Sequence, residues 1–267
     1  MLAYDFDWSV VFDNGDLLRT GLKNTLWIAF VSMILATFFG LFLALLRTSR
    51  RAPRRFIASI YINVIRGIPL LVMIIFVYFG VSLWLGINFS NFEAGVISLT
   101  VFHTAFMAEI FRTGLTAVPP GQREAALSLG MSRVRSFTSI TFPQAVRVAV
   151  PSAGNDFVGM VKDTSLVGVI GIFELYRTGQ KLVSDTFLPF EVWTGVALLY
   201  IAIVFAIDAF MRIVERHLKP GARGRGYFAR RRAAAIDDLV RRVESLPRSS
   251  TTLPDPAGLA IPPGPLT

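Results

Sequence analysis

The stretch that decides the fold is residues 22–46, LKNTLWIAFVSMILATFFGLFLALL, whose single charge is Lys23 near its start. A helix needs about 20 mainly apolar residues to cross the ~30 Å hydrocarbon core of a bilayer. This stretch meets that requirement. Residues 1–16, which precede it, are acidic and lack the basic n-region of a cleaved signal peptide. The sequence therefore predicts an extracytoplasmic segment at 1–21 and a first membrane span that stays in the protein.

The composition also indicates a membrane protein. Only 17% of the 267 residues are charged and 53% are hydrophobic, whereas soluble domains carry about 25% charge. The net charge of +9 lies beside apolar stretches, which favours a topology signal over a nucleic-acid partner. The chain has no cysteine, so disulfides and thiolate metal sites are excluded, and with two histidines a histidine metal cluster is not expected.

Four further stretches are long and apolar enough to cross the membrane, at 68–85, 94–115, 148–172 and 192–213. The third of the five spans contains His103, Glu109 and Arg112, and the fourth contains Asp156, Lys162 and Asp163. The third and fourth spans are thus polar enough to face a bundle or carry function. The predicted fold class is all-α, a polytopic membrane protein with five transmembrane helices.

The distribution of Lys and Arg sets the orientation, because basic residues collect on the cytoplasmic side. They cluster at 47–55, in the loop 118–147 and after the fifth span, while the alternate segments are acidic, uncharged or mixed. The prediction is an N-terminus outside and a C-terminus in the cytoplasm. The tail at 218–267 is basic and then rich in Pro, Ser and Thr, which predicts partial disorder. An alternative for its basic part is a helix resting on anionic lipid.

The loop at 118–147 has the pattern of two short helices. Pro119-Pro120 stops the third span, residues 122–129 favour a helix, and Gly130 permits a left-handed stop. Ser132 is a candidate N-cap for a second helix to about residue 140, which Pro143 is expected to close. A DNA-binding helix–turn–helix is disfavoured because both ends are tethered to spans. An ordinary cytoplasmic loop is the plain alternative.

This loop resembles the EAA loop of binding-protein-dependent ABC importer permeases, whose pattern is E-A-A-x3-G-x9-I-x-L-P. The sequence has Glu124-Ala125-Ala126, then Gly130, then Ile140-Thr141-Phe142-Pro143, and departs only at Phe142. In that family the short helix docks on a cytoplasmic ATPase and transmits its closure to the membrane helices. The resemblance implies that coupling to the ATPase involves Glu124, Ala125, Ala126, Leu127, Gly130 and Pro143.

Further motifs resemble the polar amino acid permeases, which transport substrates such as His, Glu, Gln, Arg or opines and have five spans. They are LKNTL (22–26), RGIPLL (66–71), AE (108–109), RTGL (112–115), FPQA (142–145), GNDF (154–157) and KDTSL (162–166). The similarity covers about residues 20–217. It implies a permease domain at 22–217 of a multi-pass protein in the bacterial inner membrane.

Polar residues in the spans are the candidate substrate contacts. Ser152, Asn155 and Asp156 fall at i, i+3 and i+4, so one helical face presents them, and the family binds its amino acid near this place. The alternative for Asp156 is a pair with a neighbouring helix.

Two further pairs of residues are weighed as parts of the pathway. Lys162 and Asp163 line it or form a structural ion pair. Arg66 and Pro69 shape a gate or mark a simple kink. Glu109 and Arg112 are expected to pair along the third span, and His103 to be a hydrogen-bonded bundle residue.

The chain has no phosphate-binding loop of the G-x-x-x-x-G-K-[ST] type, so it is not expected to hydrolyse ATP, to be an enzyme or to carry a cofactor. ATP and magnesium would belong to a cytoplasmic ABC ATPase dimer. The other expected partners are a second permease subunit (a copy or a paralogue), an extracytoplasmic solute-binding protein, membrane lipid and the amino acid. Alternative functions are transport of an opine or other polar solute, a transporter driven by an ion gradient, and a membrane anchor.

Overall fold

The computed structural model describes residues 6–218, which contain helices and no strand. Residues 1–5 and the predicted tail at 219–267 lie outside the described part. The helical elements are α1 (Ser9–Asp13), α2 (Gly15–Arg47), α3 (Ala52–Gly67), α4 (Leu70–Ile75), the π-helix η1 (Phe76–Val81), α5 (Ser82–Leu85), α6 (Asn91–Thr116), α7 (Pro120–Ser128), α8 (Arg133–Ser136), the π-helix η2 (Phe137–Thr141), α9 (Phe142–Asp163), the 3-10 helix η3 (Thr164–Ile170), α10 (Leu175–Thr186) and α11 (Pro189–Leu218).

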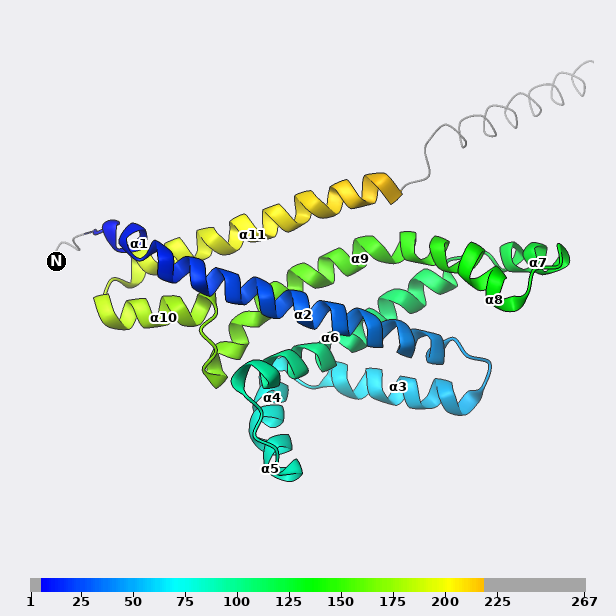
Figure 1. The fold of residues 1–267 in the computed structure, drawn as a ribbon, viewed down its shortest axis with the longest axis horizontal. Helices are drawn as coiled ribbons and strands as arrows, with labels where there is room; N and C mark the ends of the chain where they lie inside the picture. The colour runs from blue at the N-terminus through cyan, green and yellow to red at the C-terminus, as the bar shows by residue number, and fades with distance from the viewer. Residues whose placement is uncertain (1–5, 219–267) are drawn as a thin grey trace, which may run out of the picture. The chain divides into compact units, whose positions relative to one another are not determined.

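The long helices pack side by side around α6. Helix α2 packs along one side of α6, α9 along another, and α3 contacts both α2 and α6. Helix α11 packs on α9, and α10 packs on α2 and α11. Helices α7 and α8 and the α2–α3 turn lie at one end of this bundle, whereas α1 and α10 lie at the other (Figure 1).

Three helices within residues 6–218 are long and apolar enough to cross a membrane, namely α2, α6 and α11. They contain the spans predicted at 22–46, 94–115 and 192–213. Helix α3 and the run from Leu70 to Leu85 qualify together as a fourth, as a pair bent by 104°. Helix α9, which contains most of the span predicted at 148–172, is more polar and does not qualify. The described part is therefore an all-helical bundle with three or four apolar spans.

The second predicted span differs from the structure at its start. The sequence places it at 68–85, but a preceding helix, α3, covers most of the region expected to be a loop. The bend lies at Ile68, whose backbone is extended (φ −98°, ψ 129°) because Pro69 disfavours a helical residue before it. The arginines at the start of α3 conceal its amphipathic pattern from a search for uninterrupted apolar stretches.

The prediction that Pro143 closes a short helix is wrong. Residues 133–163 are continuously helical through α8, η2 and α9, and Pro143 lies in the first turn of α9. A proline in a helix removes one amide donor and crowds the preceding turn. The wider π-helical turn just before Pro143 accommodates both effects. At its other end α9 stops at Asp163, and the chain continues as η3 until Gly171, which has a left-handed φ of 90°.

Helix α10 was not predicted, and a buried carboxylate begins it. Glu174 accepts hydrogen bonds from the amides of Tyr176 (2.8 Å) and Arg177 (2.6 Å), as an N-cap does. Tyr200 of α11 donates to the same carboxylate at 3.1 Å. The amide of Leu175 donates to the hydroxyl of Thr25 in α2 at 3.0 Å. These bonds attach the η3–α10 junction to both α2 and α11.

The contact between α2 and α6 depends on Gly40. A Cβ at this position would lie 2.5 Å from Cβ of Met107 and 3.1 Å from the amide nitrogen of Ala108. Only glycine lets the two backbones approach this closely, a device common between membrane helices.

We expect Gly40→Val to lower the free energy of unfolding by about 1–3 kcal/mol, the usual cost of overpacking. Gly15→Ala is the control, because a Cβ at Gly15 meets no atom within 4 Å. The difference in stability is measured as the unfolding midpoint in detergent, which size-exclusion chromatography of the heated protein monitors. Equal midpoints for the two variants would show that the close approach contributes nothing.

Candidate functional site

The segment that resembles the EAA loop projects from one end of the bundle (Figure 1). Glu124 and Ala125 are exposed on α7, while Ala126 is buried and holds the helix against its neighbours. Gly130 ends the turn with φ of 80°, and the hydroxyl of Ser132 accepts the amide of Arg135 at 3.3 Å as the N-cap of α8.

The exposed surface of this segment is apolar as well as charged. Leu129 is 84% exposed and Val134 is 72% exposed, and Leu127 is also exposed. Large apolar side chains that stand free on a short helical hairpin are typical of a docking surface. Because residues 133–163 are continuously helical, Val134 on α8 is connected to α9 without an intervening loop, whereas α7 is joined to α8 by the turn at 129–132.

A histidine between two carboxylates joins α6 to α9. Nδ1 of His103 lies 3.1 Å from Oδ2 of Asp156 in hydrogen-bond geometry. Nε2 of the same ring lies 3.3 Å from Oδ2 of Asp163, an ion-pair distance without hydrogen-bond geometry. The histidine is 3% exposed. Asp156 is thus engaged by a neighbouring helix, and its other oxygen makes no hydrogen bond within residues 6–218.

This cluster is not a metal site. The two carboxylates lie against different nitrogens of the ring, so the three side chains do not converge on one point. Within residues 6–218 no group of three or more His, Asp or Glu side chains is arranged to hold a metal ion.

Helix α9 presents a second, exposed polar face. Ser152, Asn155 and Lys162 are exposed, and Gly159 between them opens onto free space. These residues are spaced three or four positions apart, so they form one stripe along the helix. Lys162 has no ion-pair partner in the described part of the chain, because Asp163 faces His103 instead. A polar stripe is costly against lipid, which favours contact of this face with protein or water.

The bend after α3 brings Arg66 close to the histidine cluster. Its guanidinium carbon lies 5.3 Å from the centroid of the Phe106 ring, a cation–π distance. That ring lies 6.2 Å from the His103 ring. Pro69 begins α4 directly after the bend. The structure therefore links the predicted gate residues to the helix that carries His103.

The carboxylate of Glu109, near the end of α6, forms ion pairs with two arginines. Arg112 Nε lies 2.7 Å from one oxygen, as the sequence predicted, and Arg47 of α2 binds the other. The arginine from α2 was missed because its partner lies in a different helix. Pairing across helices is not visible in local sequence spacing.

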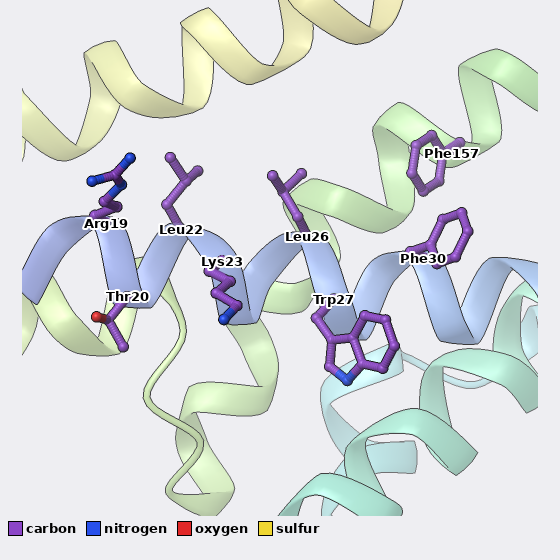
Figure 2. A pocket seen from close by; sticks show the side chains of 8 residues that line it. All are labelled: Arg19, Thr20, Leu22, Lys23, Leu26, Trp27, Phe30 and Phe157. Carbon is purple, nitrogen blue, oxygen red and sulfur yellow. The ribbon is translucent and has the colours of Figure 1, made fainter.

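A cavity of about 760 Å³ lies along the N-terminal half of α2, where Arg19, Lys23, Trp27 and Phe30 share its lining with Phe157 of α9 (Figure 2). In Figure 2 the side chains of Arg19 and Lys23 point in different directions, so the two cations do not converge on one ligand. Basic residues followed by Trp are typical of the membrane interface. This cavity therefore fits the end of a span better than a substrate site.

The His103–Asp156 contact predicts a measurable coupling. His103→Leu and Asp156→Leu each leave a mostly buried partner unpaired. The loss of unfolding free energy in the double variant should therefore be smaller than the sum of the two single losses by about 1–3 kcal/mol. Unfolding of the wild type, both single variants and the double variant in mixed micelles measures this double-mutant cycle. The matching cycle with Asp163, which is 36% exposed, should give a smaller coupling energy. Additive losses for the first pair would contradict the contact.

Comparison with known proteins places these features in a family. The profile of the family described as "binding-protein-dependent transport system inner membrane component" matches residues 36–220. The glutamine transport system permease protein of Escherichia coli (strain K12) is 34% identical over 215 residues, which cover 80% of this chain and 98% of the relative. The octopine transport system permease protein of Rhizobium meliloti is 35% identical, and the matched region covers 82% of this chain and 92% of that relative.

Solved structures agree with this assignment. The crystal structure of an amino acid ABC transporter with histidines matches with a TM-score of 0.74 and 36% identity, over 80% of this chain and all of that chain. The methionine ABC transporter MetNI in an inward-facing conformation matches with a TM-score of 0.66 at 20% identity, and thus shares the fold. The chain belongs to the binding-protein-dependent transport system inner membrane components and is similar to the amino acid ABC permeases among them.

Proposed function

We propose that this chain is the permease subunit of an ATP-binding cassette importer that carries a polar amino acid across the cell membrane. The observation that carries the proposal is the continuous helix from α8, the second helix of the exposed α7–α8 hairpin, to the polar stripe of α9. Its relatives include permease proteins of glutamine and octopine transport systems. In this proposal a solute-binding protein delivers the amino acid, and a separate ATPase dimer supplies the energy.

The proposed topology has five spans, with the N-terminus outside and the C-terminus in the cytoplasm. Helix α9 is the fourth span, although it is too polar to be recognised by hydropathy alone. Two observations support this topology. The arginine-rich α2–α3 turn and the α7–α8 hairpin lie at one end of the bundle, and the acidic N-terminal region lies at the other.

The polar stripe of α9 would face a second permease subunit, identical or paralogous, across a polar pathway. Ser152, Asn155 and Asp156 are the proposed substrate contacts, with Asp156 oriented by His103. Lys162 and Asp163 continue the same pathway toward η3. Arg66 and Pro69 form the proposed gate at the bend of the second span.

Coupling to the ATPase would run through α7. Glu124, Ala125 and Leu127 offer the exposed contact, and Ala126 seats the helix on its own subunit. Gly130 is the proposed pivot, and Pro143 lies in the first turn of α9. ATP and magnesium would bind to the partner ATPase, and this chain would hold neither.

A second candidate substrate is an opine. The octopine relative is as similar to this chain as the glutamine relative, at 35% and 34% identity. Both substrates present an ammonium and a carboxylate, which the polar side chains of α9 can meet. The two sequence identities are nearly equal, so glutamine and octopine are both included in the binding measurement below.

Coupling is tested by Glu124→Lys. The exposed carboxylate would lose a charge-assisted contact of about 1.5–3 kcal/mol, so uptake per ATP hydrolysed should fall at least about tenfold. Gly130→Pro should act likewise, because proline cannot adopt the φ of 80° found there. Uptake and hydrolysis are measured together in proteoliposomes with ATP trapped inside.

Asp13→Lys is the matched control, because it makes the same charge change on an exposed residue at the other end of the bundle. It should leave the coupling ratio unchanged. Unaltered coupling in both Glu124→Lys and Gly130→Pro would refute the role of α7. Uptake driven by an imposed ion gradient without ATP would favour a secondary transporter instead.

The substrate is tested by thermal stabilisation of the assembled complex. A ligand that binds the folded state raises its melting temperature by mass action, so the transported solute should stand out among glutamine, arginine, cystine and octopine. Asn155→Leu should abolish this shift, and Val148→Leu, an exposed apolar position on α9, should keep it. Stabilisation by octopine alone would select the opine, and an unchanged shift in Asn155→Leu would remove the stripe from the substrate site.

A further inference from the structure

A second cavity, of about 830 Å³, lies where α2 ends and α3 begins, beside the end of α6. Three arginines line it, Arg47 from α2, Arg55 from α3 and Arg112 from α6, together with Ser59 and the apolar Ala52, Pro53 and Phe56. The three guanidinium groups come from three different helices. Arg47 and Arg55 belong to the basic cluster at 47–55, and the fold adds Arg112 from α6.

The carboxylates within residues 6–218 do not balance the charges in this cavity. Glu109 is shared between Arg47 and Arg112, and Arg55 has no carboxylate partner within residues 6–218. Three guanidinium groups against one carboxylate leave two positive charges. Because Glu109 holds two of the arginines in place, their remaining N–H donors are oriented in advance for an anion.

The start of α3 adds to this preference. Its N-cap residue, Arg51, makes no side-chain cap, and Pro53 has no amide, so the amides of Ala52 and Arg54 are left without an intrahelical partner. Arginine forks match the geometry of phosphate oxygens. The chemistry of the cavity thus fits a phosphate group.

An apolar surface continues from the cavity along α3. Phe56, Ile60 and Val64 follow at intervals of four residues and are 66%, 47% and 54% exposed. This stripe leads from the charged end of the helix toward the bend at Ile68. A ligand with a phosphate at one end and an apolar chain at the other would match both surfaces.

We propose that this cavity binds the phosphate headgroup of an anionic phospholipid, with one acyl chain lying along the exposed stripe of α3. Soluble phosphate compounds offer the same anion, but they make no use of the stripe. Basic pockets between membrane helices are a general mode of recognising anionic headgroups. The site is separate from the α9 stripe and does not depend on which substrate is carried.

The test is native mass spectrometry of the whole complex released from nanodiscs of phosphatidylcholine with a rising fraction of phosphatidylglycerol. Arg55→Gln should retain about fivefold less phosphatidylglycerol than the unmodified complex, the factor that corresponds to about 1 kcal/mol per basic side chain. Arg54→Gln is the matched control, because it removes an equally exposed neighbouring charge that does not line the cavity. A third arm adds excess inorganic phosphate to the phosphatidylglycerol nanodiscs.

The proposal expects full retention in Arg54→Gln and little competition by inorganic phosphate. Equal losses in the two variants would reduce the effect to general surface charge and overturn the site. Displacement of the lipid by inorganic phosphate would assign the cavity to a soluble ligand and overturn the lipid. Both arginine variants should keep ATP-driven uptake in phosphatidylcholine, so failure of this site leaves the proposed transport function untouched.

Discussion

The structure depends on the high cost of leaving polar groups against hydrocarbon. From Ser152 to its end, helix α9 carries two carboxylates, an amide, a hydroxyl and a lysine, yet it packs within a bundle of apolar helices. The fold places His103 of α6 between the carboxylates, with a hydrogen bond to Asp156 and an ion-pair contact to Asp163. It leaves the other groups on an exposed stripe, which a membrane protein can maintain only against protein or water. The rest of the functional account follows from that division of α9 into two faces.

The two faces give α9 two neighbours. On the buried side, the histidine attaches it to α6, which in turn packs on α2 through the close contact at Gly40. On the exposed side, no helix within residues 6–218 covers the stripe, and the proposed transporter needs a partner there. A second permease subunit would supply it and enclose a polar pathway. Because the same helix runs uninterrupted from α8 into α9, a displacement of α8 would reach the pathway without crossing a loop.

Much of the fold could be predicted from the sequence because long apolar stretches are a strong and local signal. The three stretches at 22–46, 94–115 and 192–213 correspond to α2, α6 and α11. The two amphipathic helices α3 and α10 were missed, because arginines or mixed charges interrupt their hydropathy and tertiary contacts such as those of Glu174 complete them. Pro143 was misread as a helix end because the π-helical turn that accommodates it leaves no mark in the sequence.

The candidate site could be predicted only in part, for a similar reason. Helical spacing placed Ser152, Asn155 and Asp156 near one another, and the pair of Glu109 and Arg112 is local. Contacts between helices, such as His103 with Asp156 and Arg47 with Glu109, join residues far apart in the chain. A single sequence does not specify which carboxylates the buried histidine contacts.

The most direct test of the central claim is the water accessibility of the α9 stripe in the assembled transporter. The chain lacks cysteine, so Asn155→Cys provides a unique thiol, and Phe205→Cys provides one on the exposed apolar surface of α11. A small hydrophilic thiol reagent should modify position 155 rapidly and position 205 hardly at all. An unreactive thiol at 155, together with uptake that survives the substitution, would place the stripe against lipid or closed protein and contradict the account.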